Sequence, residues 1–440
     1  MQKRIAVWVL AAILCLLPLA AMTAGAETTF PALDSVSAAY LLHAESGRVV
    51  GRRNETVRVS AGASVKLLSG LVACERLGNS LDRTVMIREE MLSGGAVGRR
   101  YKLEAGDEYS VRELLLLALC GSYNDAYDVL AYCIGDGETA GTAGFVGLLN
   151  KRAAELGATA TYIGDPSGVG DNSYTSAADL SRIALAAMKN ERYLSFVGLK
   201  SGEMSGGDVI LNRNRLVSDS QSGSVLYAGM CVGETNNAGV TLVALAQKEN
   251  DSYIAVLMNP LDEDGKASES AAYSLAKSLV RWGYANYTNL EVLTPKTTVC
   301  TVPVSVSDMV DEVDVRPSES LFAYLPAGSE VGKDVLLSIR LSVETLEAPV
   351  EEGTPVGFVA AVYDGQIIGT VPLETAEAAA RSGFVSRLLS IRNLTKSRRA
   401  RAGVIFFLVC MALWIGGGTY LRRRRTTKWR QYYSSKSKWK

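Results

Sequence analysis

The chain has 440 residues, and its 46 basic side chains balance 46 acidic ones, so the formal net charge is zero. The charges are unevenly placed, because residues 422–440 contribute nine positive charges and Lys3 and Arg4 add two more. Residues 27–421 are left with a net charge of −11, which argues against a nucleic acid as partner.

Both ends of the chain carry membrane signals. Lys3 and Arg4, an apolar stretch from Ile5 to Leu19, and the small residues Ala24 to Ala26 predict a signal peptide over residues 1–26. An uncleaved anchor is the alternative. Residues 402–421 are 20 positions without a charge, enough to span a bilayer, and the basic segment 422–440 follows as a cytoplasmic tail. We therefore expect an exported protein, anchored by its C-terminal helix, with its main domains on the extracytoplasmic side.

Residues 30–287 predict an α+β domain, because strands at both of its ends enclose a helical middle. A sheet formed by the terminal segments would carry the helices. The expected strands are Ser37–His43, Arg48–Arg52, Val240–Gln247 and Ser252–Met258, and the expected helices are Val111–Leu119, Asn124–Ile134, Gly144–Leu156, Ala177–Asn190 and Ser268–Tyr284.

Residues 290–375 show short alternating strands and predict a small all-β domain. Its clearest feature is Asp364-Gly365, a hairpin turn between Val356–Val362 and Gln366–Pro372. The segment contains no cluster of chemically active residues, so a spacer or docking role is expected. Residues 376–401 are rich in alanine and then basic, which predicts a helical stalk leading to the membrane.

The cysteines and the histidine indicate no metal site and no cofactor. Outside the signal and the span, the cysteines are an odd set without C-x-x-C spacing, namely Cys74, Cys120, Cys133, Cys231 and Cys300. The only histidine, His43, ends a predicted strand, and nothing in the sequence supports a Ser-His-Asp triad built on it.

Three short segments form a more informative pattern. Ser60-Ala-Gly-Ala-Ser-Val-Lys66 has the form of an S-x-x-K box, but the position three before Lys66 is Ala63. Ser122-Tyr-Asn124 follows an apolar helix, as an S-x-N loop does. Tyr227-Ala-Gly-Met-Cys-Val-Gly233 precedes an apolar strand.

Taken in order with Asp165-Pro-Ser-Gly168 and Leu211-Asn-Arg-Asn-Arg-Leu216, these segments resemble the serine D-alanyl-D-alanine carboxypeptidases, the low-mass penicillin-binding proteins. The resemblance covers essentially the whole exported part, including the β domain and the membrane anchor. It implies a penicillin-binding, β-lactamase-like transpeptidase fold, in which an antiparallel sheet is packed with helices.

The resemblance assigns roles position by position. Lys66 matches the lysine base, and Ala63 stands where the family has its attacking serine. Ser122 and Asn124 match the residues that relay protons and hold the substrate amide. Cys231-Val232-Gly233 stands where the family has Lys-Thr-Gly, so only the glycine of that substrate-binding motif remains. Cys231 as a replacement nucleophile is a further alternative.

Three functions remain open at this point. The first is a catalytically impaired family member that binds peptidoglycan stem peptides or another cell-wall synthesis protein. The second is a working carboxypeptidase in which a distortion at Gly62 brings Ser60 or Ser64 to the site. The third is a structural, membrane-anchored interaction protein that uses the β domain and the stalk. The sequence does not indicate an oligomeric state.

Overall fold

The computed structural model describes residues 30–436 except 93–97, 136–140, 171, 220–224, 308, 385–386 and 388–397. The expected signal peptide and the last four residues of the tail lie outside the described residues. The chain divides into two compact units, residues 1–288 with 324–327, and residues 289–323 with 328–440. Each unit is described separately below.

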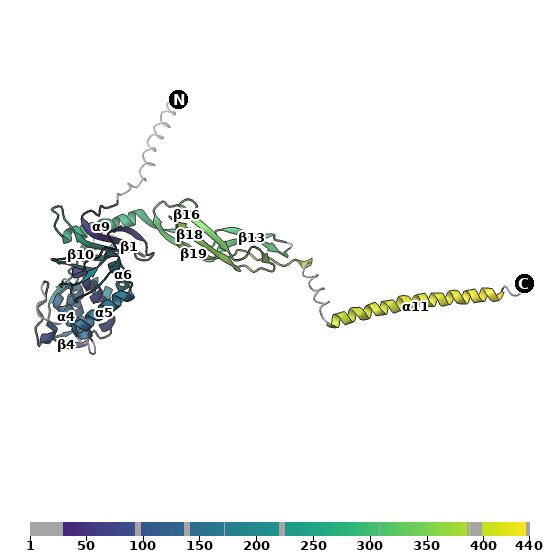
Figure 1. Cartoon of the computed structure of the whole chain (residues 1–440), viewed down its shortest axis with the longest axis horizontal. Coiled ribbons are helices and arrows are strands. Elements are labelled where there is room, and N and C mark those ends of the chain that lie inside the picture. The colour runs from purple at the N-terminus through teal and green to yellow at the C-terminus, as the bar shows by residue number, and fades with distance from the viewer. Residues whose placement is uncertain are drawn as a thin grey trace, which may run out of the picture. The chain divides into compact units, whose positions relative to one another are not determined.

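A five-stranded antiparallel sheet forms the centre of the first unit (Figure 1). Its strands are ordered β2 (Val49–Arg53), β1 (Val36–His43), β11 (Asp251–Pro260), β10 (Gly239–Lys248) and β9 (Leu226–Thr235). The first and last segments of the domain thus pair directly, with Tyr40 opposite Val256. This confirms the α+β arrangement with strands from both ends of the domain in one sheet.

Helices cover both faces of this sheet. On one face packs α9 (Glu269–Asn286), and on the other lies the larger helical group (Figure 1). That group is α2 (Val65–Leu77), α3 (Val111–Leu115), α4 (Asn124–Ile134), α5 (Thr142–Glu155), α6 (Ala177–Met188) and α7 (Glu191–Val197). Successive strand residues point to opposite faces, so β9 sends Cys231 into the core of the helical group and Val232 into the core against α9.

Short elements complete the first unit. A 3₁₀ turn, η1 (Gly62–Ser64), precedes α2, and a π-helical turn, η3 (Leu116–Cys120), follows α3. The remaining elements are β3 (Val59–Ser60), β4 (Thr84–Met86), η2 (Glu89–Leu92), β5 (Glu108–Ser110), β6 (Tyr174–Thr175), β7 (Ser201–Glu203), β8 (Val209–Leu211) and α8 (Arg215–Asp219).

The helix expected over Val111–Leu119 is not regular. It is α-helical only to Leu115, because the next five residues form η3, in which the Gly121 amide donates to the Leu116 carbonyl at 3.1 Å. A π turn inserts one residue into the helix and so rotates the residues after it about the helix axis. Hydrophobic periodicity does not register this insertion, since all five residues of η3 are buried.

The second unit is a β structure with a six-stranded sheet, ordered β16 (Val335–Leu341), β18 (Pro355–Tyr363), β19 (Gln366–Thr375), β14 (Glu312–Pro317), β13 (Cys300–Ser305) and β17 (Leu346–Glu347). The hairpin at Asp364-Gly365 joins β18 to β19 as expected. The ladder of β12 (Tyr287–Leu293) with β15 (Leu321–Pro326) is additional, and the sequence pattern missed β15.

The prediction of a helical stalk over residues 376–401 is wrong for its first residues. Residues 376–382 are not helical, and Ala379 pairs with Val350 through two backbone hydrogen bonds of 2.9 Å. Ala379 is buried in a small apolar cluster of the β domain, which holds this residue against Val350. Most of the remaining stalk lies outside the described residues. The last helix, α11 (Arg398–Lys436), contains a segment, Ile405–Arg424, long and apolar enough to cross a membrane by length and composition alone.

The packing of α9 on the sheet can be tested at Gly283. A Cβ atom at this position would lie 2.6 Å from the Tyr253 ring, and Tyr253 is fully buried. We expect Gly283→Ala to destabilise the protein by about 1–2 kcal/mol despite the better helix propensity of alanine. The matched change Gly147→Ala, at an exposed position of α5 with nothing within 4 Å, should stabilise it by up to about 1 kcal/mol. Urea unfolding of the full chain in detergent measures both; equal stabilisation by the two changes would contradict this packing.

Candidate active site

A cleft of about 410 Å³ lies between η1, the loop that follows η3, and β9, and most of the site residues predicted from the sequence line it. Ala63, Lys66, Ser122, Asn124, Val232 and Gly233 all line it. Cys231 does not, because its side chain points behind the cleft into a much smaller cavity that Lys66 and Ser122 also line. Three segments far apart in the sequence thus converge on one place.

Ala63 is held at the cleft wall by the unusual backbone of its neighbour. Gly62 has φ +48°, and a Cβ atom there would lie 2.4 Å from the Ala238 Cβ. Only glycine fits this conformation and this space. The methyl group of Ala63 faces Gly233, where an added Cβ would approach it to 2.5 Å. The first and third motifs are therefore in direct contact, with a methyl group at the position of the expected nucleophile.

Lys66 is one helical turn further along and lies almost entirely inside the protein, with 7% of its surface exposed. Its Nζ donates to the Ser122 carbonyl oxygen at 2.9 Å and contacts the Ser122 Oγ at 3.0 Å. Burial lowers the pKa of this amine to about 8. The nearby guanidinium groups of Arg99 and Arg213 also lower it, whereas Cys231 and Asp128 act in the opposite direction. An amine with this pKa is suited to accept a proton near neutral pH.

Ser122 reaches Lys66 because the backbone turns sharply after η3. Its φ is +58°, a region that non-glycine residues rarely adopt and that is found at functional sites. The Ser122 amide donates to the Ala118 carbonyl at 3.1 Å, so the π turn fixes the loop from the helical side. Asn124 then begins α4 and brings the second motif to the same cleft.

The serines of the displaced-nucleophile hypothesis differ in position. Ser64 is buried, its Oγ donates to the Ala61 carbonyl at 2.5 Å, and it does not line the cleft. Ser60 lines the cleft from β3, a strand that pairs with β6. Gly62 has a positive φ, and of the two serines in that hypothesis only Ser60 lines the cleft.

Cys231 has the environment of an inert thiol. Its Sγ lies 3.2 Å from the Ala63 carbonyl oxygen, to which it donates, and its side chain is packed in the helical core. Burial raises the pKa of the thiol to about 11, although Lys66 and a backbone hydrogen bond lower it. A thiol that stays protonated at neutral pH is a poor nucleophile. This environment argues against Cys231 as a replacement for the missing serine.

The structure adds two cations to the cleft that sequence reasoning missed. Arg213 lines it and is paired through both terminal nitrogens with the Glu269 carboxylate. Arg99 also lines it, donates to the Gly121 carbonyl at 2.7 Å and lies 4.5 Å from the Tyr123 ring centre. The Asn-Arg-Asn segment was part of the family pattern, but its sequence gave no reason to assign Arg213 a role.

Two carboxylates of α4 were also missed. Asp125 accepts hydrogen bonds from the backbone amides of Tyr101, Lys102 and Leu103, so it fixes the loop beside the cleft. Asp128 is buried, and this burial, reinforced by the charges of Asp165 and Asp125, raises the pKa of Asp128 to about 7. Asp128 does not line the cleft, but its charge acts on Lys66, which does.

The comparison with protein families matches this arrangement. Residues 25–261 match the model of the D-alanyl-D-alanine carboxypeptidases, peptidase S11, which is more than half of the chain. The chain belongs to this family. Residues 287–381 match the C-terminal domain of penicillin-binding protein 5. The chain is therefore a cell-wall protein of the carboxypeptidase family, with the second domain that accompanies it in penicillin-binding protein 5.

Individual relatives agree with this membership. D-alanyl-D-alanine carboxypeptidase DacF of Bacillus subtilis is 24% identical over 356 residues, covering 80% of this chain and 87% of DacF. DacB2 of Mycobacterium tuberculosis is 29% identical over 249 residues, covering 55% and 79%. The fold is that of penicillin-binding protein 5 from Haemophilus influenzae, with a TM-score of 0.60 at 24% identity over 80% of this chain and all of the other.

The buried Lys66 amine predicts a pH-dependent stability. Its folded pKa of about 8 lies below its usual 10.5, so between these values the unfolded chain binds more protons and stability rises with pH. At pH 7 the lysine carries its full penalty. We expect Lys66→Met to stabilise the protein there by about 2–3 kcal/mol, with the gain shrinking above pH 8. Urea unfolding from pH 6 to 10 measures the difference, and Lys151→Met, on the exposed side of α5, serves as control. A gain that is independent of pH would contradict the burial of a charged amine.

Proposed function

We propose that this carboxypeptidase-family protein binds the D-alanyl-D-alanine end of peptidoglycan stem peptides without hydrolysing it, and so acts by binding or regulation. The observation that carries the proposal is the Lys66 amine, hydrogen bonded to Ser122, beside the methyl group of Ala63. A proton acceptor remains there, but the cleft has no hydroxyl at the matched nucleophile position. Loss of a nucleophile leaves only the small rate enhancement that comes from binding and oriented dipoles.

The cleft keeps features that suit a peptide with a free carboxylate. Arg213 lines the cleft as a cation, but both of its terminal nitrogens are paired with Glu269, so a peptide carboxylate would share the guanidinium with that side chain. We assign it the role of the anion-binding lysine that Cys231 replaces. The family relative from Streptococcus pneumoniae, 20% identical with a TM-score of 0.58, is described as a peptidoglycan synthesis regulatory factor. A regulatory role is consistent with that description.

We further propose that the protein is exported by residues 1–26 and held at the membrane by residues 402–421, with the basic tail in the cytoplasm. The charge-free segment in α11 and the basic residues that follow it support this arrangement. In that position the cleft is on the same side of the membrane as the stem peptides.

The first prediction from this proposal is that benzylpenicillin does not acylate the protein. The full chain in detergent, incubated with excess benzylpenicillin, should show no gain in mass. Ala63→Ser places a hydroxyl beside Lys66 but should react little by itself. Adding Cys231→Lys and Val232→Thr should give slow acylation well above the single variant, because the changes serve one reaction and are non-additive.

The outcomes of this experiment separate the alternatives. An adduct on the unmodified protein would reject the proposal, and peptide mapping would show whether Ser60 carries it, as a working enzyme with a displaced serine requires. A triple variant that unfolds with normal cooperativity yet stays inert would mean that the cleft has been remodelled. That result would favour the interaction-protein function.

The second prediction concerns binding without turnover. N-acetylated L-Lys-D-Ala-D-Ala should bind the full chain, as measured by calorimetry, while no D-alanine is released. Arg213→Gln should weaken binding by about tenfold or more, because a charged hydrogen bond to the terminal carboxylate is lost. The control Arg215→Gln removes an exposed arginine two residues away and should leave the affinity unchanged. Equal affinities of the two variants would remove Arg213 from the site.

A further inference from the structure

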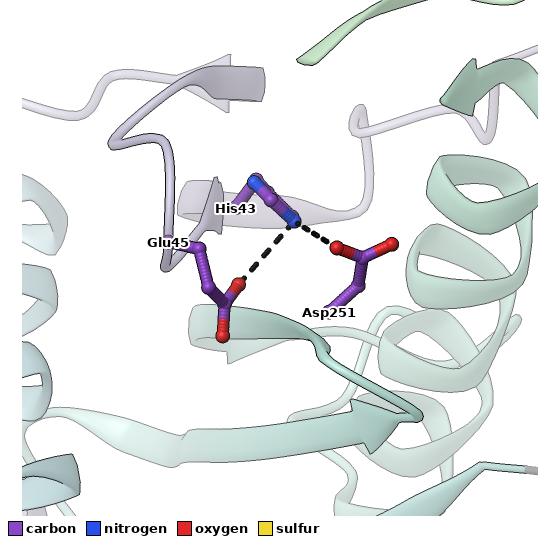
Figure 2. A group of neighbouring side chains, drawn as sticks. All are labelled: His43, Glu45 and Asp251. Carbon is purple, nitrogen blue, oxygen red and sulfur yellow. Dashed lines mark ion pairs between the residues drawn. The ribbon is translucent and has the colours of Figure 1, made fainter. Parts of the chain in front are cut away.

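A second cluster of polar side chains lies at the end of the sheet opposite the cleft. His43 is the last residue of β1, Glu45 is in the turn that follows, and Asp251 begins β11 (Figure 2). Asp251 pairs with Lys248 at the close of β10, whereas the cleft is at the other end of that strand, where Gly239 pairs with Thr235. No part of the proposed peptide site includes these residues.

The three side chains point at one another with a spacing that suits a metal ion. The His43 Nε2 is 3.3 Å from the Glu45 Oε2 and 3.5 Å from the Asp251 Oδ1 (Figure 2). All three ligand atoms lie within 4.8 Å of one another. Ligands at about 2.0–2.1 Å from a tetrahedral zinc ion are about 3.3–3.4 Å apart, so the two histidine-to-carboxylate distances match.

The imidazole ring is fixed in this orientation before any ligand binds. His43 is only 2% exposed, and its ring stacks on Tyr324 with centres 3.6 Å apart and planes 3° from parallel. The edge of Tyr253 packs against the same ring. Within the described structure, the His43 Nε2 is a buried nitrogen without a hydrogen-bond partner. A buried imidazole nitrogen aimed at two carboxylates has the donor set of a metal site.

Neighbouring groups hold the ligands from behind, as in protein metal sites. The His43 Nδ1 accepts a hydrogen bond from the Ser46 amide at 3.4 Å and lies 2.8 Å from the Ser46 Oγ. The Ser46 Oγ also accepts from the Arg48 amide at 3.2 Å. A metal ion at Nε2 would require the proton on Nδ1, which would then donate to the Ser46 Oγ in place of the bond from the Ser46 amide. The Ser252 amide, in turn, donates to the Glu45 Oε2 at 2.8 Å.

The charges of the cluster also suit a cation. Burial lowers the pKa of His43, although Glu45 and Asp251 raise it. The side chains of Glu45 and Asp251 are each 38% exposed, which gives an ion access and leaves room for water. The basic side chains on adjoining elements, Arg48 and Lys248, lie over the rings of Tyr287 and Tyr284.

We propose that His43, Glu45 and Asp251 bind one zinc ion, with water completing a tetrahedral site. An imidazole ligand favours zinc over calcium and magnesium, which prefer shells made of oxygen. The ion would connect the turn after β1 with the turn between β10 and β11, and so fix the end of the sheet away from the cleft. The site is independent of peptide binding and stands whether or not the cleft is active.

The proposal can be tested by measuring zinc binding to the full chain, purified in detergent without a polyhistidine tag. Calorimetry gives the affinity and the number of ions bound, and NMR of the selectively labelled histidine shows where zinc binds. His43 is the only histidine, so its NMR signals report on one site. We expect one zinc ion per chain, no competition from excess magnesium, and a shift of the His43 signals to the form protonated at Nδ1. Glu45→Gln and Asp251→Asn should each weaken binding by about tenfold or more, and Ser46→Ala by roughly ten- to hundredfold.

The control is Glu249→Gln, which removes an exposed carboxylate from the same turn as Asp251 and should leave zinc affinity unchanged. Thermal unfolding without zinc checks that each variant folds. Absence of saturable binding would overturn the proposal. So would zinc binding that leaves the His43 signals of the unmodified protein unmoved, since the cysteines would then hold the ion.

Discussion

The buried amine of Lys66 is the constraint on which the architecture of the cleft depends. A lysine removed from water needs acceptors, and Ser122 supplies both of those described, its carbonyl and its hydroxyl. To present both, the chain adopts a π turn at Leu116–Cys120 and a positive φ at Ser122. Asp125 then binds three amides of the neighbouring loop. One buried charge thus joins the first motif to the second and fixes the cleft wall.

The shifted pKa values around the cleft do not depend on a hydroxyl at residue 63. The pKa of Lys66 is lowered to about 8 by burial, and that of Asp128 is raised to about 7 by burial and neighbouring carboxylates. Neither shift draws on a group at residue 63. A serine at that position would make use of the lysine but would contribute little to holding it in place. Ala63 therefore places a methyl group in the same cleft as this amine, and the groups that hold the amine do not include residue 63.

The sequence predicted those parts of the structure that depend on local periodicity or on motif order. The helix over Asn124–Ile134 has the predicted bounds, because its apolar repeat and polar start are both local signals. The convergence of Lys66, Ser122 and Gly233 followed from the family resemblance. The π turn was missed because an inserted residue in an all-buried helix leaves the apolar pattern unchanged. Strand β15 was missed because its buried residues are consecutive rather than alternating.

The residues hardest to predict were those whose neighbours come from distant parts of the sequence. Arg213, Asp128 and His43 acquire their environments from segments distant in sequence, and no spacing rule connects His43 with Asp251. Asp128 titrates near neutrality only because α4 buries it close to two other carboxylates. A single sequence shows which residues have reactive side chains. Burial and neighbouring charges, which depend on the fold, decide which of these side chains have a shifted pKa.

The position of the substituted residues explains how the site could change without loss of the fold. The sheet packs through two separate cores, and β9 sends Cys231 to one and Val232 to the other. A cysteine in place of a lysine at 231 puts a neutral thiol where a second cation would face Lys66, so it removes both a desolvation cost and a like-charge repulsion. Alanine at 63 likewise removes a polar group from a buried wall. Neither residue therefore carries the burial cost that a lysine at 231 or a serine at 63 would impose on the fold.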